Sequence, residues 1–222
     1  MAITIDGNNT PTLGGVGYGD GTELAFTGAG TSGQVLTSAG GAAPTWATPS
    51  AGALTLISSA TASNTALISF TGLTTTYRIY MLEYDSVYMQ NASENLLLQF
   101  SIDGGSNYIT SGYQRTLIAQ ASGTVTGNYA TTGGVLYLGG LNGYSATSTQ
   151  TGSGILTIFA PATSGKYANT YLQSNCLNTG ILENCAGAQT NTTTSAVNAF
   201  KVYAGTGNIA GGNFRLYGLA NA

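Results

Sequence analysis

The stretch Leu96-Leu97-Leu98-Gln99-Phe100-Ser101-Ile102 decides the fold class, because a large apolar residue occupies every second position. In a β-strand successive side chains point to opposite faces, so this pattern predicts a half-buried strand. The row predicted to face a core is Leu96, Leu98, Phe100 and Ile102. The row predicted to face solvent is Asn95, Gln99, Ser101 and Asp103.

The same two-residue period continues on both sides of this stretch, from Leu54 onward. It predicts that Ile68 and Phe70 share one face, and that Phe214 and Leu216 share another. The segment 77–85 is apolar on both faces, which is typical of a central strand or of one covered by a partner subunit. Further strands are predicted near 54–60, 113–119, 134–139, 154–160, 168–176, 181–187 and 197–204.

Turn chemistry separates these strands, as at Asp103-Gly-Gly, Asn142-Gly and Gly205-Thr-Gly-Asn. No ten-residue window has a helical period with a cap and a polar face. About ten strands are enough for one two-sheet domain. We therefore predict an all-β chain, with a jelly-roll-like β-sandwich over residues 51–222 after an extended N-terminal arm over residues 1–50. A β-barrel or a β-helix is the alternative, although a solenoid needs a short fixed repeat that is not visible.

Charged residues are scarce in this chain. They make up 6% of its 222 residues, whereas a typical soluble domain has about 25%. The 33 glycines would also suit a disordered chain, but 42% of the residues are hydrophobic and 14 are tyrosines, which favours a packed fold. A surface with so little charge suits a protein packed against copies of itself or other fixed neighbours. Extracellular durability is a second explanation.

Composition also argues against several functions. The five cations are dispersed and the formal net charge is −3, so no basic stripe exists for nucleic acid. The start is unlike a secretory signal, and no apolar run is long enough for a membrane helix, so we expect assembly in a cytoplasm and no membrane insertion. The absence of histidine removes the common triads, His-ligated metals and the usual proton shuttle. We expect no enzyme activity, no catalytic residue, no metal and no cofactor.

One acidic cluster bears on that expectation. Glu83 and Asp85 lie two residues apart, hence on one strand face, and Glu94 follows in the next segment. The cluster is interpreted as a solvated rim. Paired carboxylates for cleavage of a host polysaccharide, or oxygen ligands for Ca²⁺, are the alternatives.

Cys176 and Cys185 are the only cysteines, and they flank a predicted hairpin tip at 178–181. In a reducing cytoplasm two buried thiols are expected. A disulfide is the alternative, because the two residues come close across the hairpin.

Tyrosines could serve either as sugar-stacking platforms or as filling for the core and the subunit seams. The second interpretation is favoured. The candidates for glycan or subunit contact are Tyr84, Tyr88, Tyr108, Tyr113 and Tyr144.

Residues 1–50 are rich in Gly, Thr, Ala and Pro, and their apolar residues come singly. Such a segment cannot bury a core of its own, so it is predicted either to become ordered along a partner or to act as a flexible linker. The residues predicted to mediate attachment and oligomerisation are Ile3, Ile5, Phe26, Gln34, Val35, Leu36 and Trp46.

Two segments carry a family resemblance. Gly30–Trp46, with its Gly-Gln-Val-Leu-Thr-Ser core and its Pro-x-Trp ending, resembles a segment of bacteriophage fibre and tail proteins. Gly207–Leu219, which contains Phe-Arg-Leu-Tyr-Gly, is similar to the closing strand of phage fibre-associated β-domains. The resemblance implies a homotrimeric virion structural protein, a fibre or a capsid or tail decoration component made in the bacterial cytoplasm. Its arm would attach to other virion proteins. The alternative is a lectin-like tip that recognises host-surface glycan.

A third resemblance is local. Ser101-Ile-Asp-Gly-Gly-Ser-Asn-Tyr108 looks like the Asp-box turn of sialidases and other β-proteins. In that motif the serine and the aspartate hold a hairpin turn, and the aromatic residue packs beneath it. The resemblance implies a structural turn formed by Ser101, Asp103, Gly105 and Tyr108.

Overall fold

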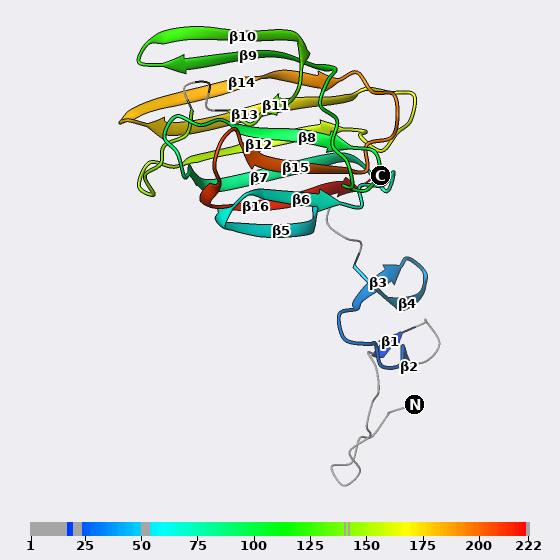
Figure 1. The fold of residues 1–222 in the computed structure, drawn as a ribbon. Coiled ribbons are helices and arrows are strands. Elements are labelled where there is room, and N and C mark those ends of the chain that lie inside the picture. Colours follow the sequence, from blue (N-terminus) through cyan, green and yellow to red (C-terminus); the bar gives the residue numbers. More distant parts are fainter. Residues whose placement is uncertain (1–16, 20–23, 50–53, 140, 142, 221–222) are drawn as a thin grey trace. The chain divides into compact units, whose positions relative to one another are not determined.

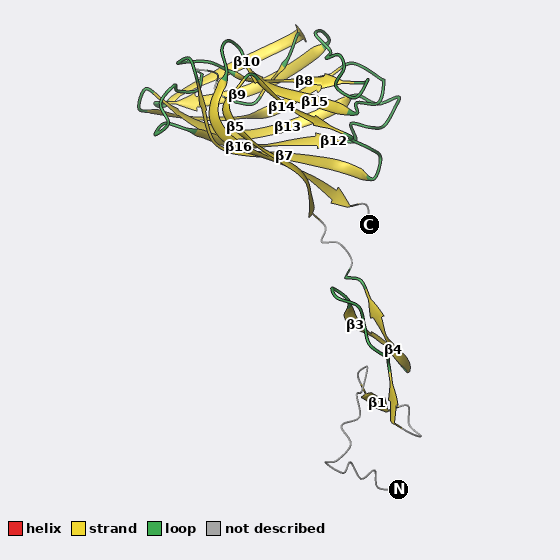
Figure 2. Ribbon diagram, turned by 60° about the horizontal axis from the view of Figure 1, so that its bottom comes forward, coloured by secondary structure: helices red, strands yellow, loops and turns green. Residues whose placement is uncertain are grey.

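The computed structural model describes residues 17–19, 24–49, 54–139, 141 and 143–220. The chain forms two compact units, Met1–Ala51 and Gly52–Ala222 (Figure 1). The boundary between them lies one residue after the boundary that the sequence predicts. The described residues contain strands and loops and no helix, as the single strand colour in Figure 2 shows. No helix that could cross a membrane is therefore present among them.

The larger unit is a β-sandwich of two antiparallel sheets, which confirms the predicted fold class. The eight-stranded sheet contains, in spatial order, β10 (Thr124–Gly133), β9 (Tyr113–Ala121), β14 (Ile181–Asn191), β13 (Ala168–Asn178), β12 (Gly152–Phe159), β7 (Tyr77–Met89), β16 (Ile209–Ala220) and β5 (Leu54–Thr65). The four-stranded sheet contains β11 (Leu136–Tyr137), β8 (Leu96–Ser101), β15 (Ala199–Ala204) and β6 (Leu67–Thr71). β7 pairs with β12 and β16, so the predicted central strand is central.

Eight of these strands have the connectivity of a jelly roll. Counted along the chain as β5, β6, β7, β8, β11, β12, β15 and β16, they form the spatial orders 1-8-3-6 and 2-7-4-5. This is the arrangement of two interlocked Greek keys. The other four strands are two insertions, β9–β10 after β8 and β13–β14 after β12, and they extend the larger sheet beyond β12.

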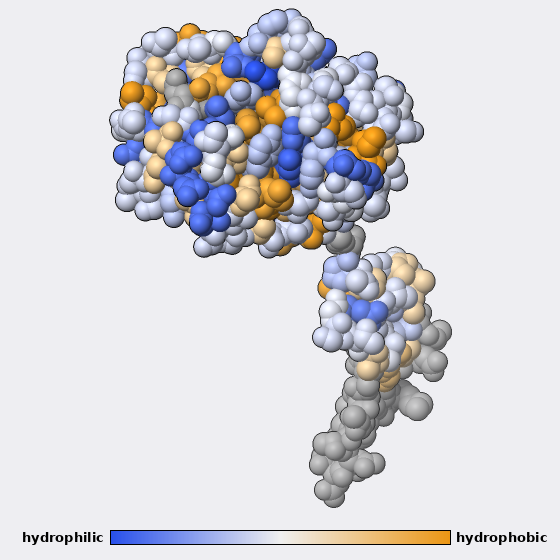
Figure 3. All heavy atoms as spheres, viewed as in Figure 1, coloured by the Kyte–Doolittle hydropathy of each residue, from blue (hydrophilic) through white to orange (hydrophobic). Residues whose placement is uncertain are grey.

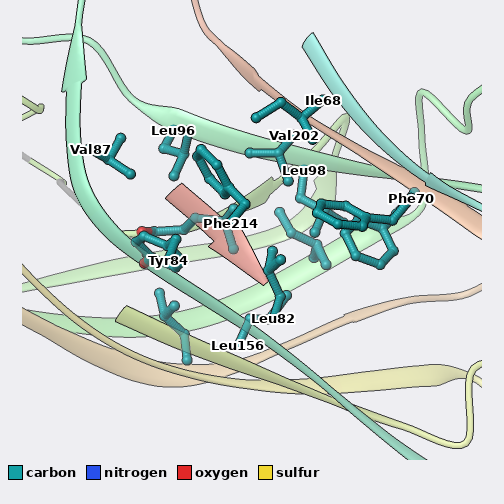
Figure 4. Close-up of a cluster of buried hydrophobic side chains, with 14 of the residues drawn as sticks. Ile68, Phe70, Leu82, Tyr84, Val87, Leu96, Leu98, Leu156, Val202 and Phe214 are labelled. Atoms are coloured by element: carbon teal, nitrogen blue, oxygen red, sulfur yellow. The ribbon is translucent and has the colours of Figure 1, made fainter. Parts of the chain in front are cut away.

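The core lies between the two sheets, and its members come from both (Figure 4). Leu82, Leu156 and Phe214 project from the eight-stranded sheet, and Leu98 and Val202 project from the four-stranded sheet. All five are at most 1% exposed. At about 25 cal/mol per Å² of apolar surface, burying one such side chain contributes roughly 1.5–3 kcal/mol, so these alternating rows hold the sheets together.

The structure confirms three of the four residues in the inward row that the sequence predicts on β8 and corrects the last one. Leu96, Leu98 and Phe100 are fully buried, but Ile102 is 45% exposed, because the strand ends at Ser101 and the chain turns away. The outward row is wrong at two positions, since Gln99 and Ser101 are buried.

Both of these polar residues are covered by loops. The Gln99 side chain donates a hydrogen bond from Nε2 to the carbonyl oxygen of Gly134 at 2.9 Å. Ser101 lies inside the turn that follows β8. An outward position is therefore not always a solvent position, and a buried amide with a carbonyl partner is a stable alternative.

Strand β10 is absent from the predicted strands, although the other predicted segments all contain strands. Its sequence is dominated by threonine, glycine and asparagine, which gives little apolar alternation. It forms one of the two edge strands of the larger sheet, and among the described strands it pairs only with β9. The partner strand supplies the hydrogen bonds that its own sequence does not predict.

The smaller unit consists of two short antiparallel ribbons. β1 (Gly17–Gly19) pairs with β2 (Leu24–Phe26), and β3 (Val35–Ala39) pairs with β4 (Ala42–Ala47). Gly40 in the β3–β4 turn has a φ of +68°, in the left-handed region that glycine adopts without strain. The predicted contact residues Ile3 and Ile5 lie outside the described residues.

Candidate assembly and binding surfaces

Trp46, the last residue of the segment Gly30–Trp46, joins the arm hairpin to the chain before it. Trp46 lies opposite Leu36 in the β3–β4 register. Its indole Nε1 donates to the carbonyl oxygen of Gly28 at 2.9 Å and to Thr27 Oγ1 at 3.1 Å. A Cβ atom at Gly30 would lie 2.6 Å from the ring, so only glycine fits beneath the indole. Trp46 therefore has an internal role in the arm.

Gln34 also has an internal role. Its Oε1 accepts a hydrogen bond from the backbone N–H of Thr31 at 2.8 Å, and its own N–H donates to the carbonyl oxygen of Thr31 at 3.1 Å. These two bonds hold the turn that leads into β3. Of the arm residues predicted to mediate contacts, Gln34 and Trp46 thus shape the hairpin.

The remaining described contact candidates of the arm are exposed apolar side chains. Phe26, Val35 and Leu36 are 43%, 49% and 37% exposed, and every residue of β3 is exposed. No residue of this unit whose burial is described is buried. The hairpin is therefore held by hydrogen bonds and by Trp46, while its apolar side chains remain available to another surface.

Three of the five tyrosines that were candidates for glycan or subunit contact are core residues, which agrees with the favoured interpretation and removes them from that set. Tyr84, Tyr113 and Tyr144 are at most 1% exposed. The hydroxyls of Tyr84 and Tyr144 both donate to the carbonyl oxygen of Leu138, and Tyr113 Oη accepts from the N–H of Phe100. Burial raises the pKa of each phenol. Each ring is inside because its hydroxyl finds a backbone partner there.

The other two tyrosines are half-buried and pack against their own chain. The Tyr88 ring covers Gly211, where a Cβ atom would lie 2.3 Å from it. The Tyr108 hydroxyl lies 2.8 Å from Ser69 Oγ, and the Lys201 Nζ atom lies 4.6 Å from the centre of its ring. Neither is presented as a free stacking platform.

The segment Ser101–Tyr108 forms a turn held by its serine and aspartate. Ser101 Oγ donates to Asp103 Oδ1 at 2.7 Å and accepts from the N–H of Gly105 at 2.9 Å. The backbone and the side chain of Asn107 both donate to the Asp103 carboxylate, at 2.9 and 2.7 Å. These hydrogen bonds lower the pKa of Asp103 to about 2, and those from Asn107 have the largest effect. The hydrogen bonds hold the shape of the turn. Gly105 lies within it at a φ of +93°, a conformation that favours glycine.

Two acidic residues of the predicted cluster, Glu83 and Asp85, lie beside Arg215. Asp85 Oδ2 lies 2.7 Å from Arg215 Nη1, and Glu83 Oε1 lies 3.9 Å from the same atom. Hydrogen bonds from Asn213 and Arg215 lower the pKa of Asp85. Since the favoured state of Asp85 is an ion paired to Arg215, its carboxyl group is poorly suited to donating a proton.

The third acid of that cluster, Glu94, binds a separate loop. It accepts hydrogen bonds from the N–H and the hydroxyl of Thr206, at 2.8 and 2.7 Å. Across the part of the chain that the structure describes, no group of three or more His, Cys, Asp or Glu residues could hold a metal ion.

Cys176 and Cys185 are buried free thiols, as the sequence predicts. The register places Cys176 opposite Glu183, and Ser174 opposite Cys185, so the two cysteines are diagonal neighbours. Burial, and secondly the Glu183 carboxylate, raise the pKa values of Cys176 and Cys185 to about 12 and about 11. Protonated, buried thiols are inert, which argues against a nucleophilic role.

The outer face of the eight-stranded sheet, the face turned away from the four-stranded sheet, carries most of the exposed large apolar side chains of the larger unit. They are spread over β5, β9, β10, β12, β13 and β14. Its exposed members are Leu54, Leu56, Ile118, Val125, Tyr129, Ile155, Phe159, Tyr171 and Leu182. The view of Figure 3, by comparison, shows small hydrophobic spots separated by polar ones.

Sequence reasoning missed the exposed tyrosines of this outer face. Tyr129 lies on β10, which was not predicted, and Tyr171 lies between inward neighbours on β13. The strict alternation of β13 was the signal that could have found Tyr171, since Thr170 and Leu172 beside it are buried.

Three comparisons relate this chain to known proteins. No family model, no curated protein and no solved structure matches the chain.

Proposed function

We propose that this chain is a structural subunit of a bacteriophage particle, a homotrimeric fibre or a capsid or tail decoration component. Its arm binds other virion proteins, and its β-sandwich is the projecting part. The particle is assembled in the bacterial cytoplasm. The support from sequence is the resemblance of Gly30–Trp46 and Gly207–Leu219 to phage fibre proteins.

The observation that carries the proposal is the arm, whose two ribbons expose Phe26, Val35 and Leu36, and in which no residue of described burial is buried. Exposed apolar side chains on a segment that cannot form its own core are best explained by a partner surface. The scarcity of charge has the same physical meaning, because a surface of Ser, Thr, Asn and Gly can be buried against copies of itself without removing many ions from water.

The test is the solution mass of the full chain and its incorporation into particles. We expect a trimer for the full chain, and loss of particle incorporation for a chain that lacks residues 1–51. The double variant Val35→Ser, Leu36→Ser should show the same loss.

Thr37→Ser is the matched control, because Thr37 is an exposed residue of the same strand whose change removes no large apolar side chain. A monomeric full chain at micromolar concentration would contradict the trimer. Normal incorporation of the truncated chain would show that the arm is not the attachment segment.

A further inference from the structure

A groove of about 280 Å³ lies on the outer face of the eight-stranded sheet, over strands β10, β9, β14 and β13. Its floor is low because small side chains lie there: Ala188 on β14 is the register partner of Thr116 on β9. Ala188 also pairs with Tyr171, and Thr116 pairs with Tyr129. The four residues therefore form one row across four neighbouring strands.

A tyrosine lies at each end of this row. Tyr129 lines the groove and is 72% exposed, and Tyr171, at the other end of the row, is 45% exposed. Neighbouring strands lie about 4.8 Å apart, so the backbones of the two tyrosines are separated by roughly 14 Å. That separation leaves room for a short oligosaccharide lying across the strands. Unlike the buried tyrosines, neither ring is used to fill the core.

Polar groups without charge complete the groove. Gln114 and Asn169 contribute amides, and Thr131 and Thr190 contribute hydroxyls. Neither amide side chain has a hydrogen-bond partner among the described residues. An amide offers two donors and an acceptor, which suits the hydroxyl groups of a sugar.

Among the described residues that line the groove, none presents an ionised group to it. Arg115 belongs to its lining, but the Arg115 guanidinium donates to Asn128 and lies 4.4 Å from the centre of the Tyr137 ring. Alternation along β9 places this side chain with the buried Tyr113 and Leu117, on the opposite face of the sheet from Thr116. Since a charged ligand would lose water there without gaining a partner, the groove favours an uncharged one.

We infer that this groove binds an uncharged saccharide, with Tyr129 and Tyr171 as stacking platforms and Gln114 and Asn169 as hydrogen-bonding groups. Tyrosines supply large and rigid amphipathic contact area, while amides and hydroxyls supply directional bonds, the combination that recognises polar ligands on open surfaces. The inference does not depend on the proposed virion role or on the number of subunits.

The test uses the full chain and uncharged trisaccharides of glucose, mannose and N-acetylglucosamine, with sialyllactose as a charged comparison. Binding is measured by saturation-transfer NMR and titration calorimetry. At least one uncharged trisaccharide should bind and sialyllactose should not. Tyr129→Ala and Tyr171→Ala should each weaken that binding at least tenfold. Ala188→Leu, which keeps both rings but raises the floor, should weaken it as well.

Tyr203→Ala is the matched control, since Tyr203 is half-buried on β15 of the other sheet, and it should bind as the parent does. Circular dichroism melting of each variant establishes that it is folded. Binding by none of the uncharged trisaccharides, or equal binding by the parent and all the groove variants, would overturn the inference. A change in solution mass for Tyr129→Ala without any saccharide binding would also overturn it, and would make this row a contact between copies of the chain.

Discussion

Asp103 shows how a single exposed residue is tied to the fold by hydrogen bonds. Its carboxylate accepts bonds from Ser101 Oγ and from both the backbone and the side chain of Asn107. Bonds to the ionised form favour that form, which is why the pKa of Asp103 falls to about 2. The same bonds join the end of β8 to the loop that carries Tyr108.

Asp103 therefore predicts a pH dependence with a definite sign. Its pKa is lower in the folded protein than in the unfolded chain, so its contribution to stability is complete above the unfolded pKa of about 3.9 and is lost as the pH falls toward about 2. We expect Asp103→Asn to be less stable than the parent at neutral pH, with a difference that shrinks below about pH 4. Denaturation midpoints of both proteins across this pH range measure it, and a difference that is constant at every pH would contradict it.

At the scale of elements, the β13–β14 hairpin is the clearest case of local sequence fixing local structure. The strands are joined by two residues, Thr179 and Gly180, with φ values of +51° and +76°. Positive φ at both central positions defines the type I′ turn, whose twist matches that of the flanking strands. Glycine adopts this conformation freely, whereas the β-branched threonine is strained in it. The turn fixes the register that places Cys176, Cys185 and Leu172 inside and Tyr171 outside.

This hairpin gives a pair of opposite predictions. Thr179→Asn should stabilise the protein by about 1 kcal/mol, because asparagine tolerates the left-handed region better. Gly180→Ala should destabilise it by roughly 1–2 kcal/mol. The space around Gly180 is open, so the second effect would be backbone strain alone. Urea denaturation of both variants measures these changes. If Gly180→Ala were neutral, strain at this turn would not matter.

At the scale of the whole molecule, the jelly roll depends on pairings between distant parts of the chain. β16 lies between β5 and β7, so the last strand of the domain is hydrogen-bonded to the first. It also contributes the buried side chains Phe214 and Leu216 to the core. Removing one large core side chain costs about 3–5 kcal/mol, and a domain of this kind has only about 5–15 kcal/mol in total. The last strand is therefore indispensable.

Deletion of residues 209–222 should consequently abolish folding, whereas deletion of residues 1–51 should leave the sandwich intact. The reason is that β16 is a central strand, while every member of the core cluster lies between Ala62 and Leu216. Far-UV circular dichroism and a cooperative thermal transition distinguish the two outcomes. A cooperative transition in the chain without β16 would show that β5 and β7 can close the sheet directly.

Much of the fold could be predicted from particular residues. The alternation in Leu96–Phe100 and in Phe214–Leu216 assigned inward faces correctly, because strand periodicity is a property of neighbouring residues. The two-sided apolar pattern of 77–85 correctly marked a central strand. The predicted exposure was wrong where a residue is covered by a segment distant in the sequence, as at Gln99 beneath the loop containing Gly134. The strand β10 has too little apolar alternation to be predicted without β9 beside it.

By itself, the sequence determined the all-β class, the turns and the inward rows, since these depend on backbone sterics and on side chains two residues apart. Only the tertiary structure decided which tyrosines are core and which are surface: Tyr84 and Tyr144 meet the Leu138 carbonyl group inside, whereas Tyr129 and Tyr171 are left outside on strands that extend the larger sheet. The physical reason is that burial depends on which strands become neighbours, and strands such as β5 and β16 meet only after the intervening chain has folded back.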